Sequence, residues 1–468
     1  MGTRISRRTV LSGTMATAAM LASGPRAAKP SKRPNILFIM ADDLGYADLS
    51  CYGRPDFRTP NIDRLAAEGM RFTQAYANSA VCSATRTALI TGRYQYRLAV
   101  GLEEPIGGRD VGIPPRHPTL PSLLRDSGYE TALIGKWHLG PLPRFGPLQS
   151  GYRHFWGYRG GAVDYFTHAM PVGSDLWDGD TPVHQAGYMT DLLGERAAST
   201  VEKFGGQDKP FFLSLHFSAP HWPWEGPSDK AESDRLKGST SVEQMKDFDA
   251  GSQATYRAMI ERMDGQVGRV LEVLKRKETG RDTIVIFTSD NGGERFADTW
   301  PFTGHKTELL EGGLRIPTII RWPGRIAPGG TSDAQIMSMD WMPTLLTATG
   351  ARTDPHYPPD GENISAAFAG GTLGERTLYW RYRHLAQRAS RRGDWKYLKI
   401  GPNEFLFDVV KDPLERANLK AREPQRFTAL KQAWEAWNAT MLPLDPAANT
   451  DGFDATELAD HFGVSVDD

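Results

Sequence analysis

The chain has 468 residues, enough for one large domain with an appended subdomain or for two or three ordinary domains. Lys plus Arg (55) nearly balances Asp plus Glu (56), so the formal net charge of −1 gives no electrostatic argument for nucleic acid or an anionic membrane as a partner. The two cysteines exclude a disulfide framework and leave a single Cys51–Cys82 bridge as the alternative to free thiols. We therefore expect a globular protein that does not bind nucleic acid.

The N-terminus has the pattern of an export signal. Residues 6–11 (Ser-Arg-Arg-Thr-Val-Leu) resemble a twin-arginine motif, and a short, weakly apolar run follows at residues 10–22. This run is too short for an ordinary membrane-spanning helix, and no later segment is apolar enough. We predict that residues 1–30 are a signal peptide read by the twin-arginine export machinery, and that the mature chain is periplasmic or secreted and has no membrane span. A disordered N-terminus is the alternative.

The next part of the chain alternates between strands and helices. Residues 35–40 form a nearly all-apolar run that is typical of a central parallel strand, and Thr59-Pro60-Asn61 has the capping residue and proline of a helix start. Further elements are predicted in order: a helix at 82–89, a helix at 122–126, strands at 130–134 and 211–215, a long amphipathic helix at 256–277 and a strand at 283–287. This order predicts an α/β fold with a largely parallel central sheet flanked by helices.

The pattern changes near residue 370. Short predicted strands at 378–380, 395–398 and 405–407 are separated by turns, and a last helix is predicted at 427–441. We therefore expect a catalytic domain over residues 31–370 and a smaller C-terminal α+β subdomain with an antiparallel sheet over residues 371–468. The polar residues 225–245 are predicted to be a surface insertion.

Polar residues gather just after the carboxyl ends of four predicted strands. In strand order they are Asp42 and Asp43, Lys136 and His138, His221, and Asp290 and Asn291. Ligands bind outside the carboxyl ends of strands in open α/β sheets, so these side chains are expected to converge. The two acidic pairs supply three carboxylates and one amide, which are hard oxygen ligands suited to Ca²⁺ or Mg²⁺. Each pair alone could be a turn or a helix cap, but two such pairs after two apolar strands favour a metal site.

A segment around the second cysteine carries the most specific motif. Cys82-Ser83-Ala84-Thr85-Arg86 resembles the sulfatase signature, in which a cysteine is oxidised to formylglycine within a Cys-x-(Pro or Ala)-x-Arg sequence. Four later segments resemble further blocks of the same family in the same order: Gly135-Lys136-Trp137-His138-Leu139-Gly140, Pro220-His221, Thr288-Ser289-Asp290-Asn291-Gly292 and residues 305–313. The resemblance extends from Asn35 to about Asn418.

The resemblance implies an alkaline-phosphatase-like fold and a sulfatase that hydrolyses sulfate monoesters, such as aryl sulfates or sulfated carbohydrates. It implies one divalent cation, Ca²⁺ or alternatively Mg²⁺, held by Asp42, Asp43, Cys82, Asp290 and Asn291. Cys82, modified by a formylglycine-generating enzyme, becomes the nucleophile. The remaining groups around the sulfate and the aldehyde are Arg86, Lys136, His138, His221 and Lys306.

The chemistry explains why such a site needs an aldehyde. A plain hydroxyl would form a sulfate ester about as hard to cleave as the substrate, whereas an aldehyde hydrate carries two hydroxyls on one carbon. One hydroxyl attacks sulfur while His221 or Lys306 gives a proton to the leaving alcohol. The other then loses its proton to His138, sulfate departs and the aldehyde returns. Cys82 is expected at a helix N-terminus, whose free N–H groups favour an anion.

Some features depart from the family pattern or allow other functions. The third signature position is Ala84, where proline is commoner, and residues 157–165 offer no equivalent of a sulfate-contacting Ser or His found in some relatives. Residues 380–384 are expected to reach the pocket from the C-terminal subdomain, with ordinary sheet packing as the alternative. Two rival functions remain: a phosphonate monoester or phosphodiester hydrolase of the same superfamily, and a non-catalytic secreted glycan-binding protein.

Individual residues also have structural alternatives. Cys82 could be an inert buried thiol, His138 a surface or core histidine, His221 part of an aromatic loop, and Lys306 a solvated charge. Cys51 is expected to serve packing rather than chemistry.

Overall fold

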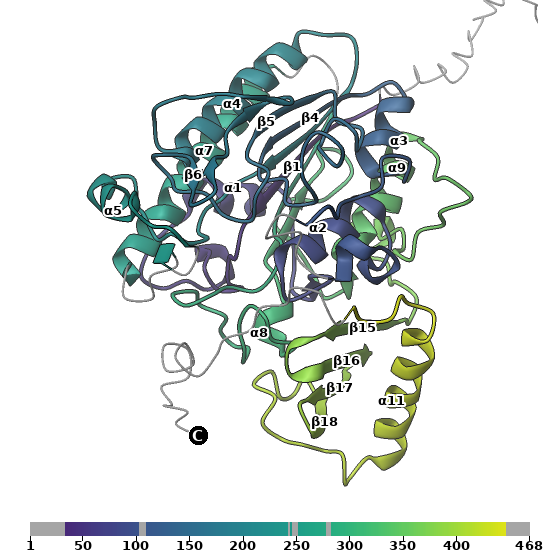
Figure 1. The fold of residues 1–468 in the computed structure, drawn as a ribbon. Coiled ribbons are helices and arrows are strands. Elements are labelled where there is room, and N and C mark those ends of the chain that lie inside the picture. The colour runs from purple at the N-terminus through teal and green to yellow at the C-terminus, as the bar shows by residue number, and fades with distance from the viewer. Residues whose placement is uncertain (1–32, 103–108, 242–243, 246–250, 278–281, 446–468) are drawn as a thin grey trace, which may run out of the picture. The chain divides into compact units, whose positions relative to one another are not determined.

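A computed structural model describes residues 33–102, 109–241, 244–245, 251–277 and 282–445. The predicted signal peptide at residues 1–30 and the end of the predicted C-terminal subdomain lie outside the described residues. Figure 1 shows how the helices and strands of the described part are arranged.

The described residues contain a ten-stranded sheet, and its centre is parallel. The spatial order is β13 (Gly330–Ser332), β2 (Met70–Phe72), β12 (Thr318–Arg321), β11 (Thr283–Ser289), β1 (Asn35–Ala41), β10 (Phe211–His216), β4 (Glu130–Gly135), β5 (His154–Gly157), β8 (Trp177–Asp178) and β9 (Thr181–Pro182). The five strands from β11 to β5 pair in parallel. Antiparallel pairs occur toward both edges, at β11–β12, β12–β2, β5–β8 and β8–β9.

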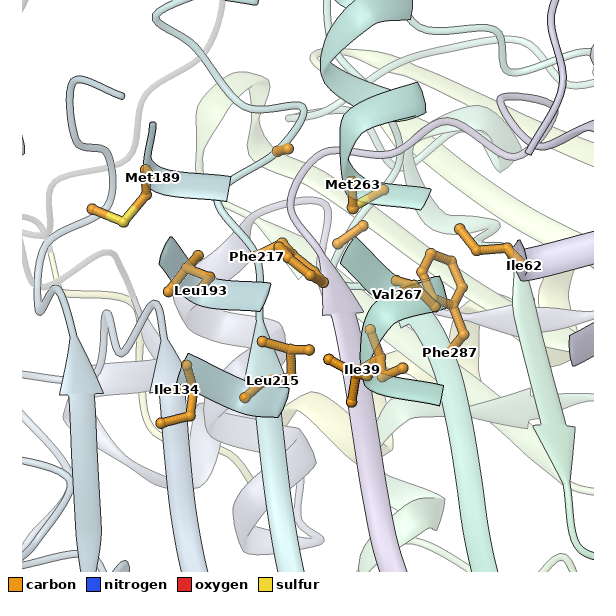
Figure 2. Packing of buried hydrophobic residues seen from close by; sticks show 14 of the residues in the cluster. Ile39, Ile62, Ile134, Met189, Leu193, Leu215, Phe217, Met263, Val267 and Phe287 are labelled. Carbon is orange, nitrogen blue, oxygen red and sulfur yellow. The ribbon is translucent and has the colours of Figure 1, made fainter. Parts of the chain in front are cut away.

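Helices cover both faces of this sheet, as the apolar central strands require. Alternate residues of β1 enter different cores: Leu37 and Ile39 pack on one face, and Ile36 and Phe38 on the other. Figure 2 shows the first face, where Ile39, Leu215 and Phe287 of the sheet meet Leu193 and Val267 of two helices. The first face carries α1 (Pro60–Ala67), α4 (Met189–Gly205) and α7 (Gln253–Arg276), and the second carries α3 (Leu120–Asp126), α9 (Trp341–Thr349), α10 (Ser365–Phe368) and part of α2 (Cys82–Thr91).

A second, four-stranded sheet follows near the C-terminus (Figure 1). It is antiparallel throughout and has the order β15 (Thr377–Tyr382), β16 (Gln387–Arg392), β17 (Trp395–Ile400) and β18 (Asn403–Asp408). One face packs against α2 through Trp380 and Leu398, and the other packs against α11 (Pro424–Asn438) through Tyr397 and Trp434. The remaining elements are α5 (Lys230–Leu236), α8 (Glu311–Leu314) and the strand pairs β3 (Ala75–Tyr76) with β14 (Ile336–Met337) and β6 (Ala169–Met170) with β7 (Gly173–Ser174).

The predicted α/β class, with a largely parallel sheet and a small antiparallel one, is confirmed. One strand was not predicted, and one prediction about the surface holds only in part. Strand β16 was not predicted, because its sequence Gln-Arg-Ala-Ser-Arg-Arg is mostly polar. The predicted surface insertion at residues 225–245 is partly buried, since Glu225 and Ser233 are inaccessible and Leu236 packs inward. None of the helices in the described ranges is sufficiently long and apolar to cross a bilayer.

Candidate active site

The predicted site residues converge at the carboxyl ends of four adjacent strands, in the order β11, β1, β10 and β4. Each side chain follows its strand within a few residues: Asp290 and Asn291 after β11, Asp42 and Asp43 after β1, His221 after β10, and Lys136 and His138 after β4. Cys82 and Arg86 come from α2, and Lys306 from the loop between β11 and α8. All of these residues are at most 8% exposed.

The two lysines lie against the two aspartates that follow β1. Lys136 Nζ donates to Asp42 Oδ2 at 2.6 Å, and Lys306 Nζ donates to Asp43 Oδ2 at 2.7 Å. Asp290 is bound by Arg86, whose Nε and Nη2 donate to Asp290 Oδ2 at 3.0 and 2.7 Å. Three buried carboxylates thus face three buried cations beside the predicted nucleophile, Cys82.

Burial and neighbouring charges shift the pKa values of these carboxyls in opposite directions. Burial, reinforced by the charge of Asp290, raises the pKa of Asp42 well above its ordinary value. Burial also opposes ionisation of Asp290, but Arg86 and Lys136 outweigh it and lower the pKa of Asp290. Asp290 is therefore more firmly ionised than Asp42, and an added positive charge would favour the ionised form of Asp42.

Two buried oxygens in this cluster lack a hydrogen-bond partner, which tests whether the residues fit a cation. They are Asp42 Oδ1 and Asn291 Oδ1, and both residues are inaccessible to solvent. A buried oxygen without a partner is costly unless an ion or water binds it. Asp42, Cys82 and Asp290 also offer ligand atoms within 4.8 Å of one another, as do Asp42, Asp43 and His221. The donor set, mainly hard oxygens, fits a divalent cation such as Ca²⁺ or Mg²⁺.

Cys82 is the first residue of α2 and is 2% exposed. The helix ends at Gly92, which adopts a left-handed conformation (φ 65°) as the sequence predicts. The Sγ atom of Cys82 lies 3.3 Å from His138 Nδ1. Neither Cys51 nor Cys82 forms a disulfide, so the alternative of a Cys51–Cys82 bridge is not supported. A buried thiol at a helix N-terminus, beside a histidine and a carboxylate cluster, differs from an inert core cysteine in its surroundings.

The pKa values of the two predicted site histidines are both lowered, which favours neutral rings. Burial, followed by the charges of Lys136 and Arg86, holds the pKa of His138 well below its ordinary value. Burial and the nearby Lys306 do the same to the pKa of His221. His221 Nδ1 lies 2.7 Å from the carbonyl oxygen of Trp222, which can only accept, so the proton of the neutral ring is on Nδ1. His221 Nε2 is then an acceptor for Lys306 Nζ at 3.2 Å.

Three residues of the site have left-handed backbone conformations without being glycine. Asp43, His138 and Thr307 have φ angles of 61°, 56° and 72°. Such conformations are strained for residues with a Cβ atom and persist where surrounding contacts fix them, often at functional sites. Asp43 and His138 belong to the cluster, and Thr307 directly follows Lys306. The strained backbone at these positions therefore helps to orient the carboxylate, the histidine and the lysine of the site.

Two residues of the cluster were missed by sequence reasoning. Glu294 Oε2 accepts from Lys306 Nζ at 3.3 Å, and His216 Nδ1 lies 3.2 Å from Arg86 Nη1. Both could have been found from the strand-end pattern, since His216 is the last residue of β10 and Glu294 follows Asp290 by four positions. Burial, then the charge of Arg86, lowers the pKa of His216 to about 3, so this ring is neutral.

Two residues of the segment 380–384, Trp380 and Arg381, make contacts other than the predicted ones at the pocket. Trp380 is fully buried and its indole N–H donates to Ala77 O, while Arg381 bonds to Asn438 at the end of α11. These contacts are sheet packing, the alternative that the sequence allowed. Gln387 of the C-terminal sheet does reach the loop of Lys306, since its side chain bonds to Thr307 O and Leu309 N.

Comparisons with known proteins bear on the family and the fold of this chain. A family model described as Sulfatase matches residues 34–351. The chain is 31% identical to N-acetylgalactosamine-6-sulfatase of Canis lupus familiaris over 406 residues, covering 80% of this chain and 73% of that protein. The crystal structure of Ps i-CgsB in complex with k-i-k-neocarrahexaose superposes with a TM-score of 0.80 at 28% identity, covering 92% of this chain and 97% of that one. The phosphonate monoester hydrolase of Agrobacterium radiobacter shares the fold, with a TM-score of 0.62 at 22% identity and coverage of 90% and 100%.

Proposed function

The chain belongs to the sulfatase family, and we propose that it hydrolyses sulfate monoesters with a formylglycine made from Cys82 as the nucleophile. The observation that carries the proposal is the position of Cys82 at the N-terminus of α2, with Sγ 3.3 Å from His138 Nδ1 and beside three buried carboxylates. Helix N–H groups and two buried ammonium groups at this point favour a compact anion such as sulfate.

The residues proposed to hold a divalent cation are Asp42, Asp43, Asp290 and Asn291, together with the modified side chain of Cys82. The unpartnered oxygens of Asp42 and Asn291 support this assignment. When bound, Ca²⁺ or Mg²⁺ would supply positive charge to the sulfate oxygens and lower the pKa of the attacking hydroxyl. Arg86 contributes indirectly, because its bonds to Asp290 keep that carboxylate ionised and oriented.

The hydrogen bonds of the site favour Lys306 as the group that protonates the leaving alcohol. His221 uses its one ring proton on Trp222 O and accepts from Lys306, so it has no proton to give in this arrangement. Lys306 Nζ is an ammonium donor held between Asp43, His221 and Glu294. His138 lies next to Cys82 and has a lowered pKa, which supports its proposed role as the base that accepts the proton lost when sulfate is released.

The relatives suggest which esters to test first. The name of the relative N-acetylgalactosamine-6-sulfatase specifies a sulfated sugar, so sulfated carbohydrates are the proposed substrate class, with aryl sulfates as simple probes. We further propose that a formylglycine-generating enzyme modifies Cys82, that residues 1–30 direct twin-arginine export to the periplasm or beyond, and that residues 31–370 and 371–468 are the catalytic domain and the C-terminal subdomain.

The proposed function is tested by comparing one purified protein on four compounds. p-Nitrophenyl sulfate and N-acetylgalactosamine 6-sulfate should be hydrolysed faster than p-nitrophenyl phosphate and a p-nitrophenyl phosphonate monoester. A preference for the phosphonate would favour the rival hydrolase, whose fold this chain shares. Absence of any turnover by protein with bound cation and modified Cys82 would favour a non-catalytic glycan-binding protein.

A further inference from the structure

Gln387 is the first residue of β16 in the C-terminal sheet, yet its side chain is 2% exposed and lies against the loop that carries Lys306. Its Oε1 accepts from Leu309 N at 2.8 Å, and its Nε2 donates to Thr307 O at 2.9 Å and to His384 O at 3.3 Å. The amide thus uses its acceptor and both donors on backbone groups. A side chain so fully bonded to backbone fixes the path of the chain around it.

The backbone that Gln387 holds is strained. Thr307 has a φ of 72°, in the left-handed region that a β-branched residue rarely adopts. Such a conformation survives only where neighbouring bonds hold the peptides on both sides. Thr307 N donates to Ala80 O at 2.9 Å, and Thr307 O accepts from Gln387. On the other side, Lys306 N donates to Gly293 O at 2.9 Å.

These bonds connect the C-terminal sheet to both ends of the proposed chemistry. Thr307 directly follows Lys306, the proposed proton donor, and Ala80 lies two positions before Cys82, the proposed nucleophile. The Lys306 side chain is long and flexible, so the position of its Nζ between Asp43 and His221 depends on where its backbone is held. Removing the hydrogen bond from Gln387 to Thr307 O would leave Lys306 present, but its Nζ atom would no longer be held in position.

We propose that Gln387 is a positioning residue through which the C-terminal sheet holds Lys306 in line to protonate the leaving group. The inference rests on the proposed function, because it assigns Gln387 a part in sulfate ester hydrolysis. A positioning role for Gln387 predicts an effect that depends on the leaving group, whereas a merely structural role does not. If Gln387 serves Lys306, its loss should harm esters whose alcohol needs a proton and spare esters whose alcohol leaves readily without one.

The test compares phenyl sulfate with p-nitrophenyl sulfate. The phenolate from phenyl sulfate is the more basic leaving group and depends more on a proton donor. Gln387→Met keeps the length and volume of the side chain and removes all three hydrogen bonds. We expect kcat for phenyl sulfate to fall roughly 10- to 100-fold, and kcat for p-nitrophenyl sulfate to fall less than about threefold, with KM little changed.

A matched control is Gln335→Met, since the amide of Gln335 also donates to the C-terminal subdomain, to Gly393 O at 2.8 Å, and this bond does not involve the Lys306 loop. This variant should keep wild-type rates on both esters. Should Gln387→Met not fold, as judged by melting temperature and cation content, Gln387→Glu replaces it: the carboxylate retains an acceptor for Leu309 N but lacks the donor for Thr307 O. The same selective loss is expected.

The possible results distinguish a failure of the proposed role of Gln387 from a failure of the proposed sulfatase function. A wild-type enzyme that hydrolyses neither sulfate would reject the proposed function. Wild-type activity on both esters, with an equal loss or no loss on both in the Gln387 variants, would overturn the inference and leave the proposed function intact. A selective loss on phenyl sulfate in the Gln387 variants, absent from Gln335→Met, supports both.

Discussion

His138 Nδ1 lies 3.3 Å from Cys82 Sγ, although the two residues are 56 positions apart and belong to different elements. The loop after β5 lies close to the ring of His138, because an added Cβ atom on Gly161 would come within 2.8 Å of His138 Cε1. The His138 ring therefore has little room to move, and it can lie beside Cys82 because residue 161 is a glycine without a Cβ atom.

This close contact predicts the effect of Gly161→Ala. The methyl group would push the imidazole away from the nucleophile, and misplacement by about 1 Å can cost roughly 100-fold in rate. We expect kcat to fall at least about tenfold with little change in melting temperature. Gly265→Ala, in α7 with open space around its Cβ position, is the control and should leave kcat unchanged. Equal rates in the two variants would argue against His138 as the base.

The cation site predicts the effect of Asp290→Asn. The amide keeps the shape of the side chain and one oxygen, but removes a charge that Arg86 and Lys136 help to hold in place. Cation content, measured by atomic emission on dialysed protein, should fall, and activity should fall at least about 100-fold. Asp333→Asn changes an exposed aspartate and should alter neither quantity. Undiminished cation content in Asp290→Asn would contradict the assigned ligands.

The sequence predicted the central elements well because their physical signals are local. Strands β1, β4, β10 and β11 are buried on both faces and so read as nearly continuous apolar runs. The polar residues just beyond them converge because parallel strands end at the same edge of the sheet. In contrast, β16 is mostly polar, and its burial depends on partners elsewhere, such as the contact of Arg391 with Glu311 at 3.7 Å.

The contacts within the site were less predictable than its members. Nothing in the spacing of the motifs specifies that Lys306 is held by Glu294, or that Gln387 of the C-terminal sheet bonds the peptide after Lys306. These contacts depend on loop conformations, including the left-handed Thr307, that arise from tertiary packing. Residues 380–384 were expected at the pocket because of their composition, but sheet pairing and packing keep Trp380 in the core.

A buried carboxyl outside the site predicts how stability depends on pH. Burial, then the nearby Asp164, raises the pKa of Glu225 from its ordinary value of 4.5 to about 9. Between these values the folded state binds more protons than the unfolded chain, so the contribution of Glu225 to stability is present at acidic pH and is lost as the pH rises. Glu225→Gln keeps an acceptor for Tyr165 N and does not ionise.

We therefore expect Glu225→Gln to be more stable than wild type at pH 8.5, by about 1–3 kcal/mol, and close to wild type at pH 5. Melting temperatures measured at the two pH values test this. Glu272→Gln, which changes an exposed residue of α7, should keep the wild-type difference between the two temperatures. A wild-type pH dependence in Glu225→Gln would show that the Glu225 carboxyl is not the group responsible.

The two-hydroxyl chemistry predicts that Cys82→Ser is trapped after one turnover. Serine presents one hydroxyl that can attack sulfur and expel the alcohol, but it has no second hydroxyl from which His138 could take a proton to release sulfate. At most about one product per enzyme should form, as a burst without turnover, and intact mass should show a sulfate ester on the serine. Cys51→Ser is the control and should turn over normally. Sustained turnover by Cys82→Ser would favour a phosphatase-like mechanism.

The most direct test of the central claim is peptide mass spectrometry at position 82 of enzyme purified in active form, paired with its rate on p-nitrophenyl sulfate. Coexpression with a formylglycine-generating enzyme, compared with expression without it, varies the extent of modification. The account predicts an aldehyde in place of the Cys82 thiol, in a fraction that rises in proportion to kcat across the preparations. Full sulfatase activity in protein whose Cys82 is entirely the unmodified thiol would contradict it.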